Sequence, residues 1–459
     1  MGGRVVPKMG LGRRRTRTPA EASLPERRWI HCLAALLALL AGCADPPATL
    51  PNVVLIDVES LRADHVAHLG YERPTSIGLD RFRADAALFS RARTPSSASA
   101  TSSASLLTGL SAGRHGVSGN RPRLADEYET LAELLRAQGF ATAALSHYFE
   151  LSEAAGFAQG FDRFESSAGP VEAHPNAAVM VDWLREWLAS EPARPFFLYL
   201  HPVNIHAPYR VPSIRRAELL GRPATRTFEY EGEIPRAVMS GRRQARMLVG
   251  PNMQHSLVDQ YDSAVRYTLD RVGEMVDLLR SSNAYDDSLI IVVGNHGEEL
   301  FDHGGFGHGY TLYEEVLRVP LYVKQPGSRR AQTIETQVSI LDVVPTVLDL
   351  LGLAARPVDG QSLAPLLVDQ TGYPGERVFT SRLAEPQNRA RQRALLRGRY
   401  KLIDSEQRYD LPRSTQELYD LLLDPGEQDD LAARSPTIAA ELSKEFDRIE
   451  AADPAPSGG

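Results

Sequence analysis

The stretch LIIVV at residues 289–293 runs directly into GNHGEE at residues 294–299, and His303 and His308 follow among several glycines. Imidazole, amide and carboxylate groups at the end of an apolar strand are how α/β enzymes present metal ligands and acid/base groups at a sheet edge. This stretch therefore predicts a metal-dependent hydrolase. The alternative is a polar loop of turn residues, which is less consistent with two glutamates and three histidines packed among glycines.

From Pro51 onward, short apolar runs alternate with stretches that have helical spacing. This alternation implies right-handed crossovers and an α/β fold, in which helices sandwich a large, mostly parallel sheet. Ligands in such sheets bind beyond the C-terminal ends of the strands. Strands are expected at Val53–Ile56, Ala141–Leu145, Phe196–Leu200, Leu289–Val293 and Pro320–Val323, and helices at Glu129–Ala137, Ala177–Ala189, Val258–Leu279 and Leu341–Leu351.

The pattern changes around residue 375. The later residues predict a small antiparallel sheet with one helix, as a C-terminal subdomain over 376–459 that follows a catalytic domain over 51–375. The strand-like runs are Arg377–Thr380, Ala394–Leu396 and Tyr400–Ile403, and the amphipathic stretch is Ile438–Ile449.

The first 42 residues have the features of a signal peptide, because arginines precede an apolar run from Cys32 to Ala41. The tetrapeptide LAGC at 40–43 resembles a bacterial lipobox, and acylation of Cys43 would hold the protein at a membrane surface. We therefore expect an exported bacterial lipoprotein, periplasmic or outer-membrane-associated, with a short tether over 43–50. A plain secretory signal with an incidental Cys43 is the alternative.

Charge and cysteine content narrow the chemistry further. Residues 1–42 hold eight Lys/Arg and two Asp/Glu, whereas the whole chain has a net charge of −7, so the remainder is strongly acidic. An acidic body argues against nucleic acid as a partner. Both cysteines, Cys32 and Cys43, lie in the export segment, so any covalent catalysis by the mature chain must use oxygen. The sequence gives no indication of the oligomeric state.

Three further segments are expected at the same sheet edge. Asp57 and Glu59 follow the first strand, would face the same side by strand alternation, and suit a hard cation such as calcium or magnesium. The hydroxyl-rich run from Ser96 to Leu110 places an alcohol near a helix N-terminus, which favours an anion, although such serines also serve as N-caps or turns. His206 follows the strand that begins at Phe196.

Together these segments resemble the sulfatase family of the alkaline phosphatase superfamily, over nearly the whole mature chain. The resemblance rests on ordered matches at Pro51–His65, Leu107–Val117, His206–Tyr209, Tyr261, Asp262, Asp270, His296–Glu299, Gly307–Gly309, Tyr313–Pro320, Asp342, Pro345, Thr346, Asp359–Leu363, Gly398–Lys401, Glu417–Asp420 and Asp424–Glu427.

The resemblance implies one divalent metal, most often Ca²⁺ with Mg²⁺ or Mn²⁺ as alternatives. Carried over by position, its ligands are Glu59, Ser60, the nucleophile Ser99, and Asn295 with His296. In the same way, His206 and His308 contact the transferring group or protonate the leaving oxygen, and His147 stands where many members place a sulfate-binding lysine.

Two departures from the family pattern bear on the mechanism. Sulfatases convert a residue of a Cys/Ser-x-Pro-x-Arg motif into formylglycine, but here the run is Ser99–Ala100–Thr101–Ser102–Ser103. The missing cysteine, proline and arginine argue against formylglycine, so Ser99 would form a covalent ester directly. Glu59, Ser60 and Asn295 also replace residues that are usually aspartates, which removes charge from the metal site.

The leading hypothesis is a lipid-anchored hydrolase of sulfate or phosphate esters, with glycans among its substrates. The sequence is compatible with two alternatives. One is a catalytically silent relative that binds anionic glycans, and the other is transfer of a phosphoryl-linked group onto an envelope polymer through Ser99.

Overall fold

The computed structural model describes residues 50–119, 121–166, 177–209, 211–212, 217–219, 221, 249–368, 373, 377–385, 390–407 and 415–452. The predicted signal peptide and all of the predicted tether except Leu50 lie outside these residues. From Leu50 onward the chain forms one compact unit. Among the described helices, none is long and apolar enough to cross a membrane.

An eight-stranded sheet, in the order β10-β2-β9-β6-β1-β5-β3-β4, forms the centre of this unit. Its strands are parallel except β9, which runs antiparallel to both neighbours. The predicted α/β fold with a mostly parallel sheet is therefore confirmed. The strands are β1 (Asn52–Val58), β2 (Ala87–Arg93), β3 (Ala141–Ser146), β4 (Arg163–Ser166), β5 (Phe196–His201), β6 (Ser288–Gly294), β9 (Arg318–Lys324) and β10 (Gln332–Ser339).

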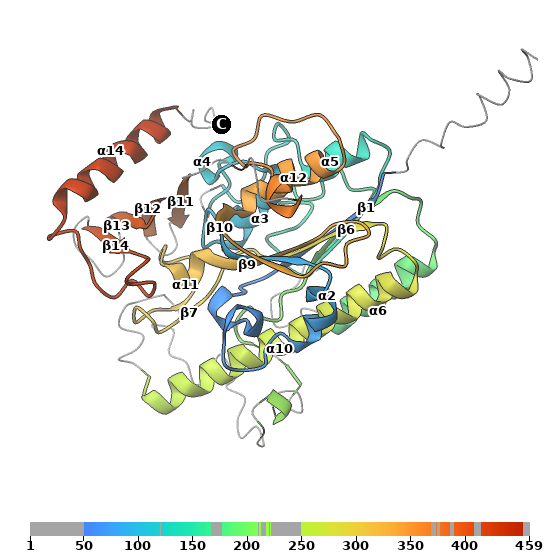
Figure 1. The fold of residues 1–459 in the computed structure, drawn as a ribbon, viewed down its shortest axis with the longest axis horizontal. Helices are drawn as coiled ribbons and strands as arrows, with labels where there is room; N and C mark the ends of the chain where they lie inside the picture. The colour runs from blue at the N-terminus through green and yellow to red at the C-terminus, as the bar shows by residue number, and fades with distance from the viewer. Residues whose placement is uncertain are drawn as a thin grey trace, which may run out of the picture. The chain divides into compact units, whose positions relative to one another are not determined.

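Helices cover both faces of this sheet, as Figure 1 shows. Side chains of β1 alternate between two cores: Val54 and Ile56 pack into one, and Val53 and Leu55 into the other. This is why the central strands appear in the sequence as unbroken apolar runs. The first core includes α2 (Asp80–Arg83), α6 (Ala177–Ala189) and α10 (Pro251–Ser281), and the second includes α3 (Ser99–Thr108), α5 (Leu131–Arg136), α12 (Val343–Leu350) and α13 (Ala364–Val368).

A second, antiparallel sheet follows in the order β11-β12-β13-β14, and α14 (Pro436–Ala452) packs its buried Leu442 and Phe446 against one face. The predicted small sheet with one helix is confirmed, with one strand more than expected. Its strands are β11 (Val378–Glu385), β12 (Ala390–Arg397), β13 (Tyr400–Gln407) and β14 (Thr415–Asp420).

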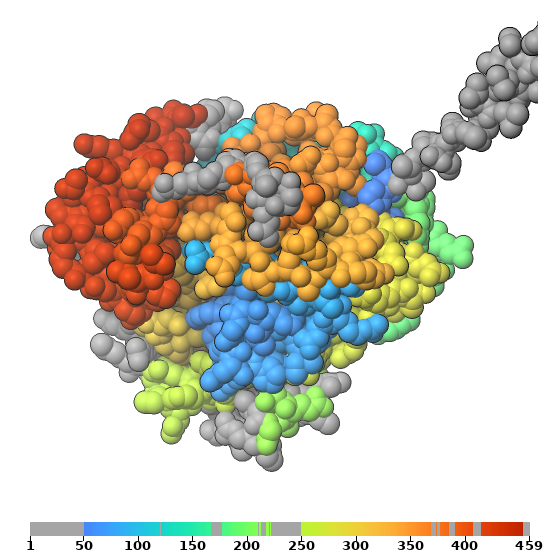
Figure 2. All heavy atoms as spheres, in the orientation of Figure 1, coloured from blue at the N-terminus to red at the C-terminus, as the bar shows by residue number. Residues whose placement is uncertain are grey.

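Buried ion pairs join the two sheets. Lys401 of β13 contacts Glu314 at 3.0 Å and Glu427 at 2.8 Å, and Arg93 of β2 contacts Glu314 at 2.7 Å. Glu314 is the first residue of the short helix α11 (Glu314–Leu317). Another short helix, α4, spans Ala112–His115. Figure 2 shows the C-terminal residues, in red, directly against the orange segment that precedes them. The division near residue 375 stays a prediction.

His303 lies in this junction, close to the two-stranded sheet of β7 (Glu299–Leu300) and β8 (Phe306–Gly307). Its Nδ1 is 2.6 Å from Glu315 Oε1, its Nε2 is 2.9 Å from the Glu427 carbonyl oxygen, and its ring stacks on Tyr313. Burial opposes the charged form, but Glu315 outweighs it and raises the pKa of His303 to about 9. A charged His303 therefore stabilises the folded state.

This raised pKa gives a pH-dependent stability prediction. The stabilisation is complete below the unfolded pKa of about 6.5 and is lost as the pH rises through about 9. We expect His303→Gln to lower the free energy of unfolding by about 1–3 kcal/mol at pH 6 and by clearly less at pH 10. Urea unfolding at both pH values measures this, with the exposed His255→Gln as control; a deficit that does not change with pH would contradict it.

Candidate active site

Three neighbouring parallel strands end at the same edge of the large sheet. Glu59 follows β1, His206 follows β5, and Asn295 and His296 follow β6. Ser99 is the first residue of α3, so its hydroxyl lies at the helix N-terminus as predicted, although the helix begins earlier than the leucines at 106 and 107 suggested. The strand order brings together residues that are up to 237 positions apart in the sequence.

Glu59 is the centre of the hydrogen-bond network. Its Oε1 accepts a hydrogen bond from Ser99 Oγ at 2.6 Å and lies 3.0 Å from His296 Nε2. Its Oε2 accepts from Asn295 Nδ2 at 2.6 Å. Burial alone would raise the pKa of Glu59, but His296 and His201 outweigh it and hold that pKa well below its usual value. Glu59 is therefore a buried, ionised carboxylate.

Ser99 Oγ also lies 3.0 Å from His296 Nε2, so the hydroxyl sits between an imidazole and a carboxylate. Ser99 lines a cavity of about 540 Å³ together with His308. An alcohol held against an ionised base and facing a cavity has the arrangement of an activated nucleophile.

The loop that carries His296 is fixed by tight backbone packing. The Gly297 N–H donates to the Val316 carbonyl at 2.9 Å, and a Cβ at Gly297 would lie only 1.9 Å from the Glu315 carbonyl oxygen. The buried Arg62 donates to the Glu298 carbonyl at 3.0 Å. Glycine is therefore required at 297, and the loop holds its polar side chains in place.

His201, the last residue of β5, was not predicted from the sequence. Fully buried, it lies 3.4 Å from Asp57 Oδ2 and 3.2 Å from Glu59 Oε2. Burial opposes its charge, yet these carboxylates raise the pKa of His201 to about 10, so an imidazolium stands behind Glu59. Strand alternation from Phe197 through Tyr199 to His201 was the signal that could have identified it.

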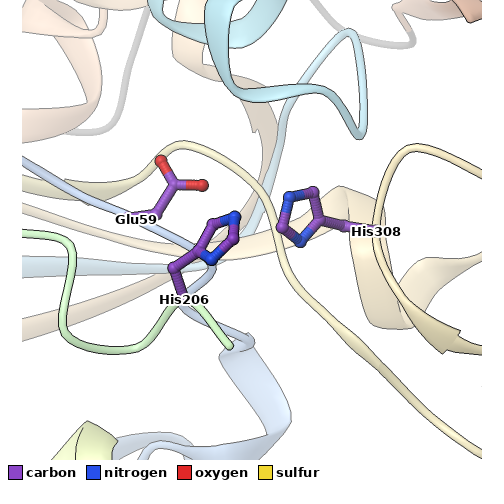
Figure 3. A group of neighbouring side chains, drawn as sticks. All are labelled: Glu59, His206 and His308. Carbon is purple, nitrogen blue, oxygen red and sulfur yellow. The ribbon is translucent and has the colours of Figure 1, made fainter. Parts of the chain in front are cut away.

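His206 and His308 point toward Glu59 from two different loops (Figure 3). His206 Nδ1 lies 2.7 Å from the Ala207 carbonyl oxygen, and His308 Nδ1 lies 2.9 Å from Glu298 Oε1. One ligand atom from each of Glu59, His206 and His308 lies within 4.8 Å of the other two. Histidines held through Nδ1 in this way are typical of metal ligands, so this triad fits a divalent ion.

The ligand set implied by the resemblance is less suited to a metal ion than this triad. Asn295 Oδ1 accepts hydrogen bonds from the Ser60 and His296 backbone N–H groups, at 3.1 and 2.7 Å, and its amide nitrogen faces Glu59. Glu59 is thus the one carboxylate that the set Glu59, Ser60, Asn295 and His296 contains. Calcium takes about six to eight oxygen ligands, so these four residues fit it poorly.

His147 is buried directly after β3, and its backbone N–H donates to the His201 carbonyl at 3.4 Å. It is not among the described residues that line the cavity. Its predicted role in sulfate binding stays a prediction.

Comparison with known proteins agrees with this arrangement. The Sulfatase family profile matches residues 51–353, and the profile of the N-sulphoglucosamine sulphohydrolase C-terminal region matches residues 302–452. Among curated relatives, the choline-sulfatase of Rhizobium meliloti is 33% identical over 175 residues, which cover 36% of this chain and 33% of that protein. Arylsulfatase K of Gallus gallus is 29% identical over 180 residues, covering 38% and 33%.

These first matches span about a third of the relatives' own length. Over a longer stretch, the N-acetylglucosamine-6-O-sulfatase of Bacteroides thetaiotaomicron is 21% identical over 423 residues, covering 73% of this chain and 75% of that protein. The similarity to the choline-sulfatase is therefore higher but more local.

Solved structures share the fold. The phosphonate monoester hydrolase of Agrobacterium radiobacter superposes with a TM-score of 0.68 at 19% identity, covering 88% of this chain and 96% of that chain. A protein solved with its substrate D-glucosamine-2-N,6-O-disulfate gives a TM-score of 0.71 at 18% identity, covering 87% and 97%. With a family match over residues 51–353 and the predicted fold confirmed, the chain belongs to the sulfatase family.

Proposed function

We propose that the protein hydrolyses sulfate or phosphate esters with Ser99 as the nucleophile. The observation that carries this proposal is the 2.6 Å hydrogen bond from Ser99 Oγ to Glu59 Oε1 at the edge of a cavity. In a sulfatase-family fold, this contact supplies the hydroxyl and the base that ester cleavage by an unmodified serine requires.

In the first step, Ser99 Oγ attacks the sulfur or phosphorus of the ester while its proton passes to Glu59. The bond to the alcohol oxygen breaks, and that oxygen takes a proton from solvent water. In the second step water attacks the sulfur or phosphorus of the serine ester, the bond to Ser99 Oγ breaks, and the proton held by Glu59 returns to Ser99 Oγ. Sulfate or phosphate leaves, and the proton of the attacking water passes to solvent. The His201 imidazolium keeps Glu59 ionised in the resting state and is a positioning residue, because it touches Glu59 and not Ser99.

A divalent ion would be held by Glu59, His206 and His308. When bound, it would neutralise negative charge on the transferring group. Imidazole and carboxylate together suit Zn²⁺ or Mn²⁺, whereas Ca²⁺ and Mg²⁺ prefer oxygen ligands. We therefore propose a nitrogen-accepting ion instead of the Ca²⁺ that the resemblance alone favours.

The ion can be tested without measuring turnover. Metal-stripped protein titrated with Co²⁺ is expected to develop a visible absorption band from a histidine-ligated ion, and Zn²⁺ is expected to abolish it. Glu298→Gln, which weakens the support of His308, is expected to lower the affinity for Co²⁺ by about 10–100-fold. His68→Ala is the control, since His68 bonds Tyr322 and Asp80. Tight Ca²⁺ binding without a Co²⁺ band would contradict this assignment.

A substrate panel tests the reaction itself. Turnover of 4-nitrophenyl sulfate, 4-nitrophenyl phosphate and a phenylphosphonate ester would be measured side by side, with mass spectrometry of the peptide that contains Ser99. Phosphate esters are a second candidate substrate because Ser99 lies outside a formylglycine motif. An unmodified serine would form a phosphoserine intermediate, which water can hydrolyse. No turnover of any ester, with binding to sulfated glycans, would favour the silent alternative.

The setting of the reaction is also a proposal. The lipobox-like LAGC at 40–43 supports an exported lipoprotein held to a membrane through Cys43. Glycan sulfates are among the substrates that fit such a location, since one relative is named as an N-acetylglucosamine-6-O-sulfatase. The choline-sulfatase similarity supports small alcohol sulfates as a second substrate class. Mass spectrometry of the exported protein would show whether Cys43 is acylated.

A further inference from the structure

The cavity beside Ser99 contains an acidic side chain. A carboxylate repels an anionic substrate, so binding of the anion does not explain its presence. Glu150 lines this cavity together with Ser99 and His308. Its carboxylate accepts a hydrogen bond from the backbone N–H of Ala100, in the first turn of α3. The free N–H groups of a helix N-terminus usually attract the anion of a substrate. Here one of them is already used by the protein's own carboxylate.

The described residues compensate the charge of Glu150 only in part: burial and Glu59 raise the pKa of Glu150 by more than the charge of His308 lowers that pKa. Arg123, which also lines the cavity, forms an ion pair with Asp126 at 2.7 Å. His308 is paired with Glu298 at 2.9 Å. Burial, followed by the negative charge of Glu59, raises the pKa of Glu150. Both effects disfavour the ionised carboxylate, and a positively charged ligand group beside it would reverse them.

Aromatic rings stand next to this carboxylate. Tyr148 and Phe149 precede it in the chain and line the same cavity, with their ring centroids 5.1 Å apart. Phe149 is 47% exposed, so part of its side chain is accessible to a ligand. An ammonium group is attracted to an aromatic face within about 6 Å as well as to a carboxylate.

We propose that Glu150, Tyr148 and Phe149 form a subsite for an ammonium group, so that the preferred ester carries this group on its alcohol part. The inference rests on the proposed hydrolysis at Ser99 and names its substrate class. Because Glu150 bonds Ala100, the residue after the nucleophile, the cation lies close to the reacting ester. The spacer between ammonium and ester oxygen is therefore short, in the range of two or three carbons.

Two esters of the same shape separate charge from size. One is the sulfate ester of 2-(trimethylammonio)ethanol, and the other is 3,3-dimethylbutyl sulfate, in which carbon replaces the ammonium nitrogen and only the positive charge is lost. Calorimetry on the Ser99→Ala protein measures the affinity for each without turnover, and kcat/KM is measured on the unmodified protein. We expect the ammonium ester to be favoured at least tenfold in both measurements.

The variant Glu150→Gln keeps an oxygen that can accept from Ala100 and removes only the charge. We expect this variant to bring the ratio of the affinities for the two esters close to one, mainly by weakening binding of the ammonium ester. Glu153→Gln is the matched control, because Glu153 is exposed and does not line the cavity. If Glu150 served only to cap α3, its substitution would change both esters equally.

The outcomes distinguish this inference from the proposed function. Equal affinity for the two esters, no binding of either, or a preference that survives Glu150→Gln would overturn the ammonium subsite. Selective binding of the ammonium ester with no hydrolysis of any ester would overturn the hydrolase and leave the subsite standing. Hydrolysis of both esters at equal rates would overturn the ammonium subsite and support the proposed hydrolase.

Discussion

Replacing Ser99 by alanine is expected to lower kcat/KM on an aryl sulfate or phosphate by at least about 10³-fold. Ser99 Oγ donates to Glu59 and faces the cavity, and the described part of the chain holds no thiol that could take over its role. The residual rate would come from binding and from the surrounding charges alone. Loss of kcat with little change in KM is the pattern expected of a missing nucleophile.

The matched control for this substitution lies in the same helix. Ser105 is buried in α3 like Ser99, but its hydroxyl is 2.8 Å from His115 Nε2. Ser105→Ala is expected to cost about 1 kcal/mol of stability and to leave turnover within a few-fold of the unmodified protein. Thermal unfolding of both variants excludes misfolding as the cause. Equal activity of Ser99→Ala and the unmodified protein would falsify the nucleophile assignment.

The sequence predicts the strands of the sheet's centre well, and its edges poorly. Strands β1, β5 and β6 are apolar runs because both of their faces are buried, and such runs stand out without knowledge of the fold. Strands β2 and β10 were not predicted, because ALFSRAR and QTIETQVS mix apolar with polar and charged residues. Their pairing through Arg93 and Ser339 is a tertiary effect that no local pattern records.

The candidate site shows the same division. Strand ends placed Glu59, Asn295, His296 and His206 at one edge, because parallel strands deliver their C-termini together. What each side chain does there depends on its partners. Asn295 was expected to offer its oxygen to a metal, but two backbone N–H groups occupy that oxygen. The ion pairs of His201 likewise arise only when β1 and β5 lie side by side.

Glu59→Gln is expected to have an effect on turnover as large as Ser99→Ala, at least about 10³-fold, because it removes the base that receives the proton. The substitution also removes the carboxylate of the triad with His206 and His308, because the glutamine amide is uncharged. Binding of Co²⁺ should therefore weaken together with turnover. In Ser99→Ala, by contrast, Co²⁺ binding should persist, because that serine is outside the triad.

The stability of Glu59→Gln carries a second expectation. The pKa of Glu59 is held below its usual value, so the carboxylate stabilises the folded state above the unfolded pKa of about 4.3 and ceases to do so as the pH falls. The variant should unfold more easily than the unmodified protein at pH 7, by about 1–3 kcal/mol, and the gap should narrow toward acidic pH. Urea unfolding across pH 3–7 measures it.

Asp57→Asn separates this charge effect from the chemistry. Asp57 is also fully buried and contacts His201, but it accepts its hydrogen bonds from Ser103 and Tyr199 and has no contact with Ser99. Both variants remove one carboxylate from the same imidazolium, so both should lose stability. Turnover should fall less than about tenfold in Asp57→Asn, because the base in contact with Ser99 remains. Equal losses of turnover in the two variants would mean that Glu59 acts only through the charge balance around His201.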